Sequence, residues 1–140
     1  MQNYNSKFKI LPHTADLKIQ VYGKTREELF KNALLGMASA LRAKIKDKKL
    51  KIKNKVKIKS LDLPALLVDF LSEALYLSQV NKESYYDVIF KKFTDTEIKG
   101  ELIGQKVERF GEDIKAVTYH GLEIKQNKNG ILELTILFDI

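Results

Sequence analysis

The chain begins with two short segments, residues 8–11 and 17–22, whose patterns predict β-strands. In the second segment Leu17, Ile19 and Val21 alternate with polar residues, so that all three apolar side chains point to one side. This alternation is typical of a strand with one buried face. We therefore expect the chain to open with a pair of neighbouring strands.

Two later segments have the apolar spacing of amphipathic helices. The first runs from residue 25 to about 42 and opens with Thr25 and Glu28, which form a capping box. The second begins near Asp62, a favourable N-cap, and has Pro64 in its first turn. We predict this second helix to be the main core helix, because its apolar residues form a wide stripe: Leu63, Leu66, Leu67, Phe70, Leu71, Ala74 and Leu75.

Between the two helices, residues 50–60 alternate apolar and basic positions. The pattern predicts a strand with lysines on its solvent face, where they also discourage pairing with other sheet edges. Asn54 interrupts the apolar side, and a break in the strand is possible there. The row of lysines, called the lysine comb below, consists of Lys51, Lys53, Lys55, Lys57 and Lys59.

The last third of the chain predicts strands at residues 86–93, 97–103, 114–124 and 131–138. Asn129-Gly130 favours a two-residue hairpin turn between the last two strands. In that register His120 faces Asp139, whereas a bulge at Gly121 would shift the register by one residue and remove the pairing.

The order of elements is typical of the α+β class. We expect a two-layer sandwich, with a mostly antiparallel or mixed sheet and two main helices packed on one face. Residues 1–140 are expected to form a single domain, because no linker, repeat or low-complexity segment divides them. The chain is 44% hydrophobic and long enough to bury a core. It has no cysteine, which excludes disulfides, thiolate catalysis and zinc–sulfur sites.

The expected location is cytoplasmic, with no membrane association. The first nine residues are polar and lack the apolar segment of a secretion signal. No apolar run approaches the roughly 18 residues of a membrane span.

The net charge of +7 comes from one part of the chain. Residues 41–60 hold ten basic residues and one acidic residue, whereas the remainder holds 15 basic and 17 acidic residues. This basic stripe has two interpretations. It can meet RNA or another phosphate-rich partner, or it can be the solvated face of a strand.

Three carboxylates are candidates for a metal site: Asp16, Asp139 and the terminal group of Ile140, if the chain ends there. Clustered carboxylates repel one another unless a cation or a shared proton relieves them. Oxygen ligands suit a hard divalent cation such as Ca²⁺ or Mg²⁺. The sequence alone does not bring Asp16 close to Asp139, and an aspartate at a strand end also serves as a turn or cap residue.

Conventional enzyme motifs are absent from the sequence. No nucleophile–base pair is visible, and the glycines at 100 and 104 lack the lysine of a phosphate-binding loop. If it faced a carboxylate, His120 could carry a proton or orient a ligand; the alternative is a structural polar pair. Lys115, taken alone, is an exposed lysine at the start of a strand.

Four segments together resemble the archease family, whose members assist the RtcB-type RNA-splicing ligase. They are His13-Thr14-Ala15-Asp16, the core-helix run from Leu66 to Leu77, the run from Ile114 to His120, and the final Asp139-Ile140. The resemblance covers nearly the whole chain in the family order. It implies a compact fold with a sheet and packed helices.

The resemblance also implies a function and a site. Archeases bind a divalent metal at one tip, and the corresponding ligands here are Asp16, Asp139 and Ile140. Ca²⁺ or Mg²⁺ is expected, with Mn²⁺ as a third candidate. Lys115, His13 and His120 are candidates for ligase activation.

In this family the protein is not an enzyme but an activator, which promotes GTP-dependent guanylylation and repeated turnover of the ligase. The expected partners are that ligase, which uses the GTP, and tRNA halves, contacted directly or through the ligase. The ligase joins 2′,3′-cyclic phosphate or 3′-phosphate ends to 5′-hydroxyl ends in tRNA splicing and RNA repair.

The sequence departs from the family pattern at two places, and two alternative functions stay open. Ser72-Glu73 stands where the family commonly has Asn-Glu, and Glu108 or Arg109 stands where many relatives have a histidine. One alternative function is an RNA-binding module acting through the lysine comb and the stripe 41–60. The other is a metal-dependent hydrolase, which the lack of a clear general base disfavours.

Overall fold

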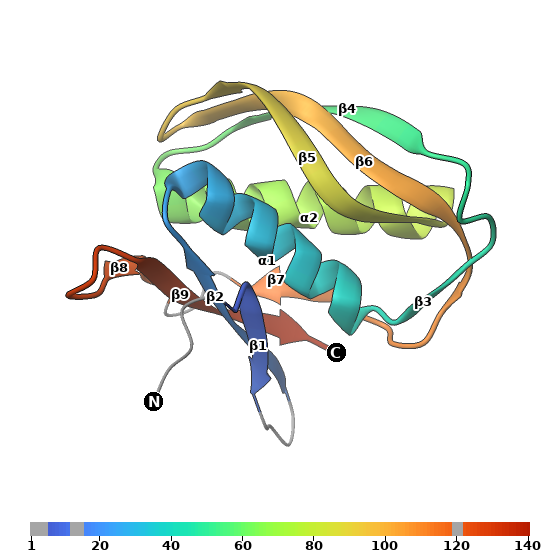
Figure 1. Ribbon diagram of the computed structural model, residues 1–140, viewed down its shortest axis with the longest axis horizontal. Helices are drawn as coiled ribbons and strands as arrows, with labels where there is room; N and C mark the ends of the chain where they lie inside the picture. The colour runs from blue at the N-terminus through green and yellow to red at the C-terminus, as the bar shows by residue number, and fades with distance from the viewer. Residues whose placement is uncertain (1–5, 12–15, 119–121) are drawn as a thin grey trace.

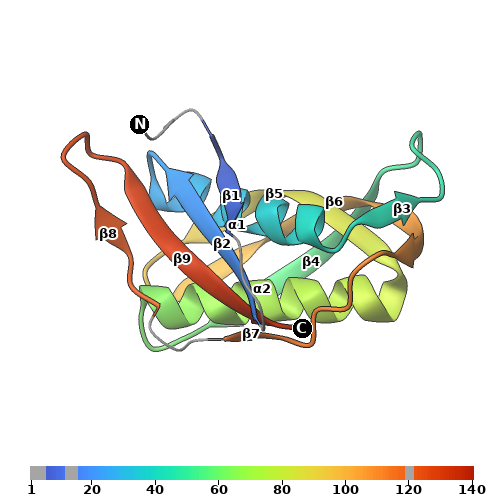
Figure 2. The ribbon, with the colours of Figure 1, turned by 90° about the horizontal axis from the view of Figure 1, so that it is seen from below.

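The computed structural model describes residues 6–11, 16–118 and 122–140. Two antiparallel sheets enclose the two helices (Figures 1 and 2). The first sheet is built from both ends of the chain, with strand order β1-β2-β9-β7, and β8 also pairs with β9. Its strands are β1 (Phe8–Leu11), β2 (Asp16–Gly23), β7 (Ala116–Thr118), β8 (Lys125–Gln126) and β9 (Leu132–Asp139).

The helices begin where the sequence predicts. Helix α1 (Arg26–Ala40) is capped by Thr25, whose Oγ1 accepts a hydrogen bond from the N–H of Glu28 at 3.1 Å. Helix α2 (Leu63–Asn81) is capped by Asp62, which accepts a hydrogen bond from the N–H of Ala65 at 2.9 Å. These side chains satisfy N–H groups that a helix start leaves without partners.

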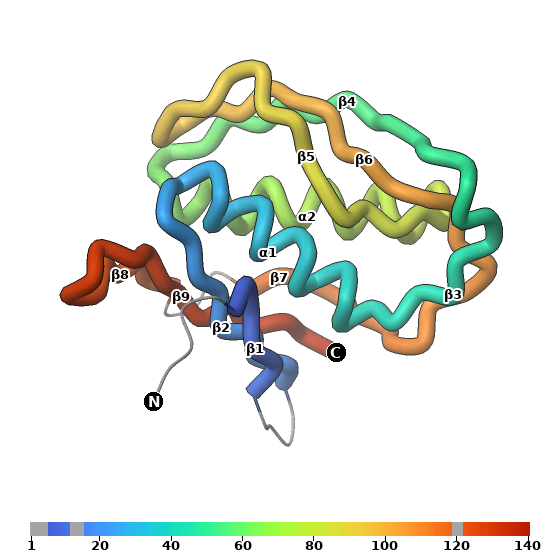
Figure 3. Tube along the Cα trace, viewed as in Figure 1, coloured from blue at the N-terminus to red at the C-terminus, as the bar shows by residue number. Residues whose placement is uncertain are grey.

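The second sheet is formed by the middle of the chain. The long hairpin of β5 (Glu83–Phe93) and β6 (Glu97–Phe110) curves over the helices (Figure 3). On the other side, β6 pairs with β4 (Ile52–Lys59) and, farther along, with β3 (Ala43–Ile45). Helix α1 contacts β2 of the first sheet and β5 of the second, so the core lies between the sheets.

Helix α2 is the core helix that the apolar stripe predicts. Leu66, Leu67, Phe70 and Leu71 are fully buried. The helix has 19 residues and a mean hydropathy of 1.3, so by length and composition alone it could cross a membrane. Asp69 and Glu73 interrupt its apolar residues, so it is not an unbroken apolar run of that length, and the core helix of a protein passes the same test of length and composition.

The α+β class with two helices is confirmed, with differences in detail. The strands form two sheets instead of one, and the helices lie between them. Strand β3 was not predicted, and the segment predicted as one strand at 114–124 contains only the short β7 among its described residues. Strand β4 runs through Asn54 without a break.

Candidate functional site

The two aspartates of interest lie directly opposite each other at one end of the first sheet. Strand β2 begins at Asp16 and the antiparallel β9 ends at Asp139, and the register pairs these two residues. The next pair along the strands, Leu17 and Phe138, is buried in the core. Because successive side chains alternate between faces, both aspartate side chains lie on the outer face of the sheet.

A third strand places Lys115 beside the same aspartate. Strand β7 pairs with β9 so that Ala116 lies opposite Asp139, on the side away from β2. The N–H of Lys115 donates a hydrogen bond to the carbonyl oxygen of Asp139 at 2.7 Å. The side chain of Lys115 is exposed. Three segments far apart in the sequence thus meet around Asp139.

The carboxylates of Asp16 and Asp139 form no ion pair with any described side chain. Side chains directly opposite on neighbouring strands have Cβ atoms about 5 Å apart, and like charges at that distance destabilise the pair. A bound cation relieves this repulsion. The arrangement therefore favours binding of a positive group at this end of the sheet.

The donor set fits a hard divalent cation in chemistry but is small. Within the described ranges, no group of three or more His, Asp or Glu side chains is placed to hold a metal ion. Two carboxylates are present, and Ile140, which follows Asp139, brings main-chain oxygen atoms next to them. Mg²⁺ and Ca²⁺ accept such all-oxygen sets, with water completing the shell.

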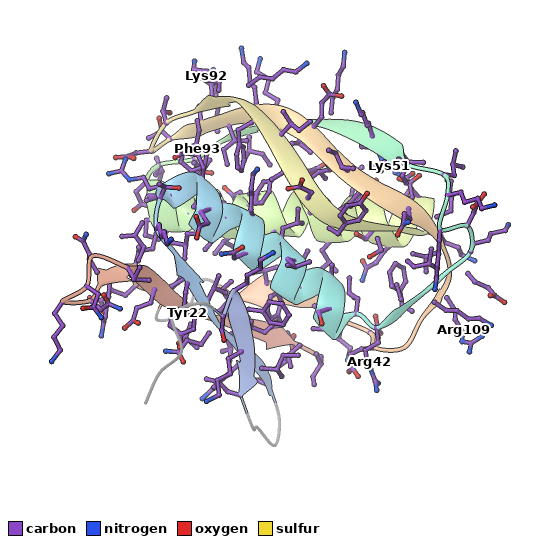
Figure 4. The ribbon with its side chains drawn as sticks, in the orientation of Figure 1. Tyr22, Arg42, Lys51, Lys92, Phe93 and Arg109 are labelled. Atoms are coloured by element: carbon purple, nitrogen blue, oxygen red, sulfur yellow. The ribbon has the colours of Figure 1, made fainter. Side chains whose placement is uncertain are left out.

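An apolar hollow adjoins this end of the sheet. Its lining includes Ile10, Leu17 and Ile140, together with Arg42 and Glu112, whose side chains form an ion pair at 3.3 Å. Figure 4 shows Arg42 near the C-terminal end of the chain. This hollow was not predicted, because the strand pattern at 8–11 does not indicate that Ile10 is 44% exposed.

The predicted pairing of His120 with Asp139 is wrong, because Ala116 holds that position. Near the hairpin, Lys125 pairs with Glu133, and Gly130 has φ +78° in a turn longer than the predicted two residues. From Thr118 in β7 to Lys125 in β8 the chain advances seven residues, whereas β9 advances four, from Leu137 to Glu133. This difference shifts the register by three residues and the longer turn by one more, so Ala116 takes the place predicted for His120. His13 and His120 themselves lie outside the described residues.

The lysine comb is far from the aspartate pair. Lys53, Lys55, Lys57 and Lys59 point outward from β4, and Lys51 lies exposed just before it. The second sheet is on the opposite side of the helices from β2 and β9 (Figure 1). The structure therefore separates two candidate surfaces that the sequence left unrelated.

The positions that depart from the family pattern have ordinary environments. Ser72 and Glu73 are half-buried on α2. Glu108 forms an exposed ion pair with Lys44 at 3.3 Å, and Arg109 is exposed at the far end of β6 (Figure 4).

Comparison with known proteins identifies the family. The Archease protein family (MTH1598/TM1083) matches residues 8–140. The archease of Methanosarcina barkeri is 39% identical over 140 residues, covering 93% of this chain and 94% of the relative. The archease of Thermococcus kodakarensis is 31% identical, covering 89% and 92%.

Solved structures share the fold at lower identity. The solution structure of protein 1598 from Methanobacterium thermoautotrophicum has a TM-score of 0.65 and 23% identity, covering 96% of this chain and 99% of that one. The crystal structure of an archease from Thermotoga maritima, described as a possible chaperone, has a TM-score of 0.67 and 18% identity, covering 94% and 96%. With a family match over nearly its whole length, this chain belongs to the archease family.

Proposed function

We propose that this protein is an accessory activator of an RtcB-type RNA ligase, acting through the end of the first sheet where Asp16 and Asp139 meet. The observation that carries the proposal is the direct pairing of these unneutralised carboxylates in a member of the archease family. An accessory activator assists another protein and catalyses no reaction itself. The description of the Thermotoga maritima relative as a possible chaperone supports a role of this type.

The proposed cation ligands are Asp16, Asp139 and the main-chain oxygen atoms of Ile140. Ca²⁺ and Mg²⁺ suit these oxygen donors, and Mn²⁺ is a further candidate. When bound, the cation supplies positive charge that attracts phosphate oxygens. A metal-dependent hydrolase would need a fuller set of ligands, and no observation favours one here.

Lys115 is proposed to contact the ligase or a phosphate group at the same tip. Its main-chain N–H is bonded to Asp139, and its exposed ammonium group forms no ion pair with the described residues. A lysine presents a compact charge that suits a phosphate or an acidic side chain. The assisted step would be GTP-dependent guanylylation of the ligase, which joins tRNA halves in the cytoplasm.

The experiment that tests this proposal is RNA ligation with limiting ligase over many turnovers. The reactions contain the cognate ligase, GTP and a divalent metal, with no addition, the wild-type protein, Asp16→Asn, or Asp95→Asn. Asp95 is a matched control, because its exposed carboxylate lies in the β5–β6 turn of the other sheet and, among the described residues, forms an ion pair with Arg26 alone. The measured quantity is the increase in turnover over the reaction with no addition. We expect this increase to be at least tenfold larger with the wild type or Asp95→Asn than with Asp16→Asn.

The cation is tested with the same variants by thermal unfolding with and without Ca²⁺, Mg²⁺ or Mn²⁺. A ligand at 100 times its Kd stabilises the folded state by about 2.7 kcal/mol. This stabilisation should be lost in Asp16→Asn and kept in Asp95→Asn. Stimulation of the ligase by wild type and Asp16→Asn alike would retain the activator role and reject the tip as its site.

A further inference from the structure

The outer face of the second sheet carries three lysines in one row across three strands. Lys57 of β4 lies directly opposite Lys99 of β6, and Lys99 lies opposite Lys92 of β5. All three are exposed. We call Lys57, Lys92 and Lys99 the lysine row. Only Lys57 belongs to the lysine comb, because Lys92 and Lys99 lie on other strands. The pairing of the three strands is what brings these lysines into one row.

Like charges at directly opposite positions destabilise a sheet. The acidic side chains beside the lysine row relieve only part of this repulsion. Glu97 pairs with Lys92 at 2.5 Å and with Lys59 at 3.8 Å, and Glu101 pairs with Lys91 at 2.9 Å.

The remaining lysines of this face form no ion pair with the described residues: Lys53, Lys55, Lys57 and Lys99. This face therefore keeps a local excess of positive charge, which the neighbouring carboxylates of Glu97 and Glu101 offset only in part.

The lysines also surround a shallow hollow. Lys55, Lys57, Lys91 and Lys99 contribute to its lining together with Glu101. Neighbouring strands lie about 4.8 Å apart, and residues two apart along a strand are about 6.7 Å apart. Ammonium groups at these intervals can reach successive phosphates of a nucleic-acid strand.

We propose that this face, centred on the lysine row, binds the phosphate backbone of RNA. The described part of the face exposes Ile89 as its large apolar side chain, at 45%, and no aromatic ring. Binding should therefore depend on phosphate contacts and be insensitive to base sequence, because stacking platforms and base-edge contacts provide such selectivity. A membrane-binding surface would be expected to present several apolar anchors.

The position of the face allows it to act independently of the aspartate pair. The second sheet and the end of β2 and β9 lie on opposite sides of the helix layer (Figure 1). RNA held on the lysine row would leave Asp16 and Asp139 accessible to a protein partner. The inference goes beyond the proposed ligase activation and does not depend on it.

The test measures binding of a fluorescein-labelled single-stranded RNA of mixed sequence by anisotropy, with EDTA and without ligase or GTP. The variant Lys57→Gln/Lys92→Gln/Lys99→Gln is compared with Lys24→Gln/Lys125→Gln/Lys128→Gln, three exposed lysines elsewhere. Both triple variants lower the net charge by three, so a difference between them reports position.

We expect the row variant to bind at least tenfold more weakly at about 50 mM salt and the control variant to stay within about twofold of wild type. Each phosphate contact on a single strand contributes about −0.7 to the slope of log K against log salt. Loss of three contacts should therefore make the slope for the row variant less negative than that of wild type by about 2. Replacing the row with three arginines should restore binding.

Three results would overturn the inference. One is equal weakening by the two triple variants, which would mean that only the overall charge matters. Another is a wild-type affinity that does not change with salt. The third is competition by phosphatidylserine vesicles but not by unlabelled RNA, which would assign the face to membranes. Because the replaced side chains are exposed and their removal relieves repulsion between opposed like charges, the row variant should be at least as stable as wild type, and unfolding curves check for a folding defect.

Discussion

Asn54 interrupts the alternation of β4 because it belongs to a buried polar cluster. Its Nδ2 donates hydrogen bonds to Oε1 of Glu83 and to the hydroxyl of Tyr85, both at 2.6 Å. The Tyr85 hydroxyl also donates to Glu83, and the Lys106 ammonium group lies 2.9 Å from the other carboxylate oxygen. Glu83 is only 5% exposed, so its charge depends on these donors.

The cluster shifts the pKa values of its two acids in opposite directions. Burial favours the protonated form of Glu83, but hydrogen bonds from Tyr85, Lys106 and Asn54 outweigh it and lower the pKa of Glu83 below 4.5. Burial, and next the hydrogen bond to Glu83, raise the pKa of Tyr85 to about 12. The stability from Glu83 is thus lost as pH falls below about 4.5, and that from Tyr85 as pH rises from about 10 to 12.

The variant Glu83→Gln should therefore be less stable at pH 7 and less sensitive to acid. Loss of hydrogen bonds to a charged group costs about 1.5–3 kcal/mol. Urea unfolding at pH 7 and at pH 4 measures both effects. We expect the stability difference between wild type and variant to be smaller at pH 4, because the carboxylate of the unfolded chain, with its higher pKa, takes up a proton there more readily than that of the folded protein. An unchanged difference would contradict the role assigned to this carboxylate.

The elements best predicted from the sequence are those specified by local signals. The helix starts at Thr25 and Asp62 follow from capping residues and apolar spacing, both of which act within a few residues. The division of the strands into two sheets depends on which strands pair, which periodicity does not encode. The error at Asp139 likewise arose because a turn at Gly130 and extra residues before β8 set the register.

The curvature of the β5–β6 hairpin depends on glycines of β6 opposite irregularities in β5. At Gly104 an added Cβ would lie 2.2 Å from the carbonyl oxygen of Ser84, where the register shifts between Tyr85 and Asp87. Bulges bend a strand and increase its twist. The sequence shows no phosphate loop at this glycine, and the close backbone approach explains why glycine stands there.

The variant Gly104→Ala should lower the free energy of unfolding by about 1–3 kcal/mol, because backbone must move to admit the methyl group. Glu108→Ala, at an exposed position of the same strand, serves as the control and should change stability by about 0.5 kcal/mol or less. Chemical denaturation of the three proteins gives the comparison. Equal stability of Gly104→Ala and wild type would show that the hairpin does not require this close approach.

For the whole molecule, the fold separates two charged surfaces of opposite sign. The paired aspartates lie at the end of the first sheet, and the lysine row lies on the outer face of the second. From the sequence, Asp16 and Asp139 were candidates for one cation site, and Lys115 was joined to them only through the family resemblance. Their contact became visible in the order β2-β9-β7, because long-range pairing brings the ends of the chain together.

The central claim is that the aspartate pair acts on the guanylylation of the ligase. The most direct measurement is the initial rate of label transfer from GTP to a cognate ligase with a divalent metal present. Wild type and Asp95→Asn should raise this rate, whereas Asp16→Asn and Asp139→Asn should leave it near the rate of the ligase alone. An undiminished rate with both tip variants would contradict the claim.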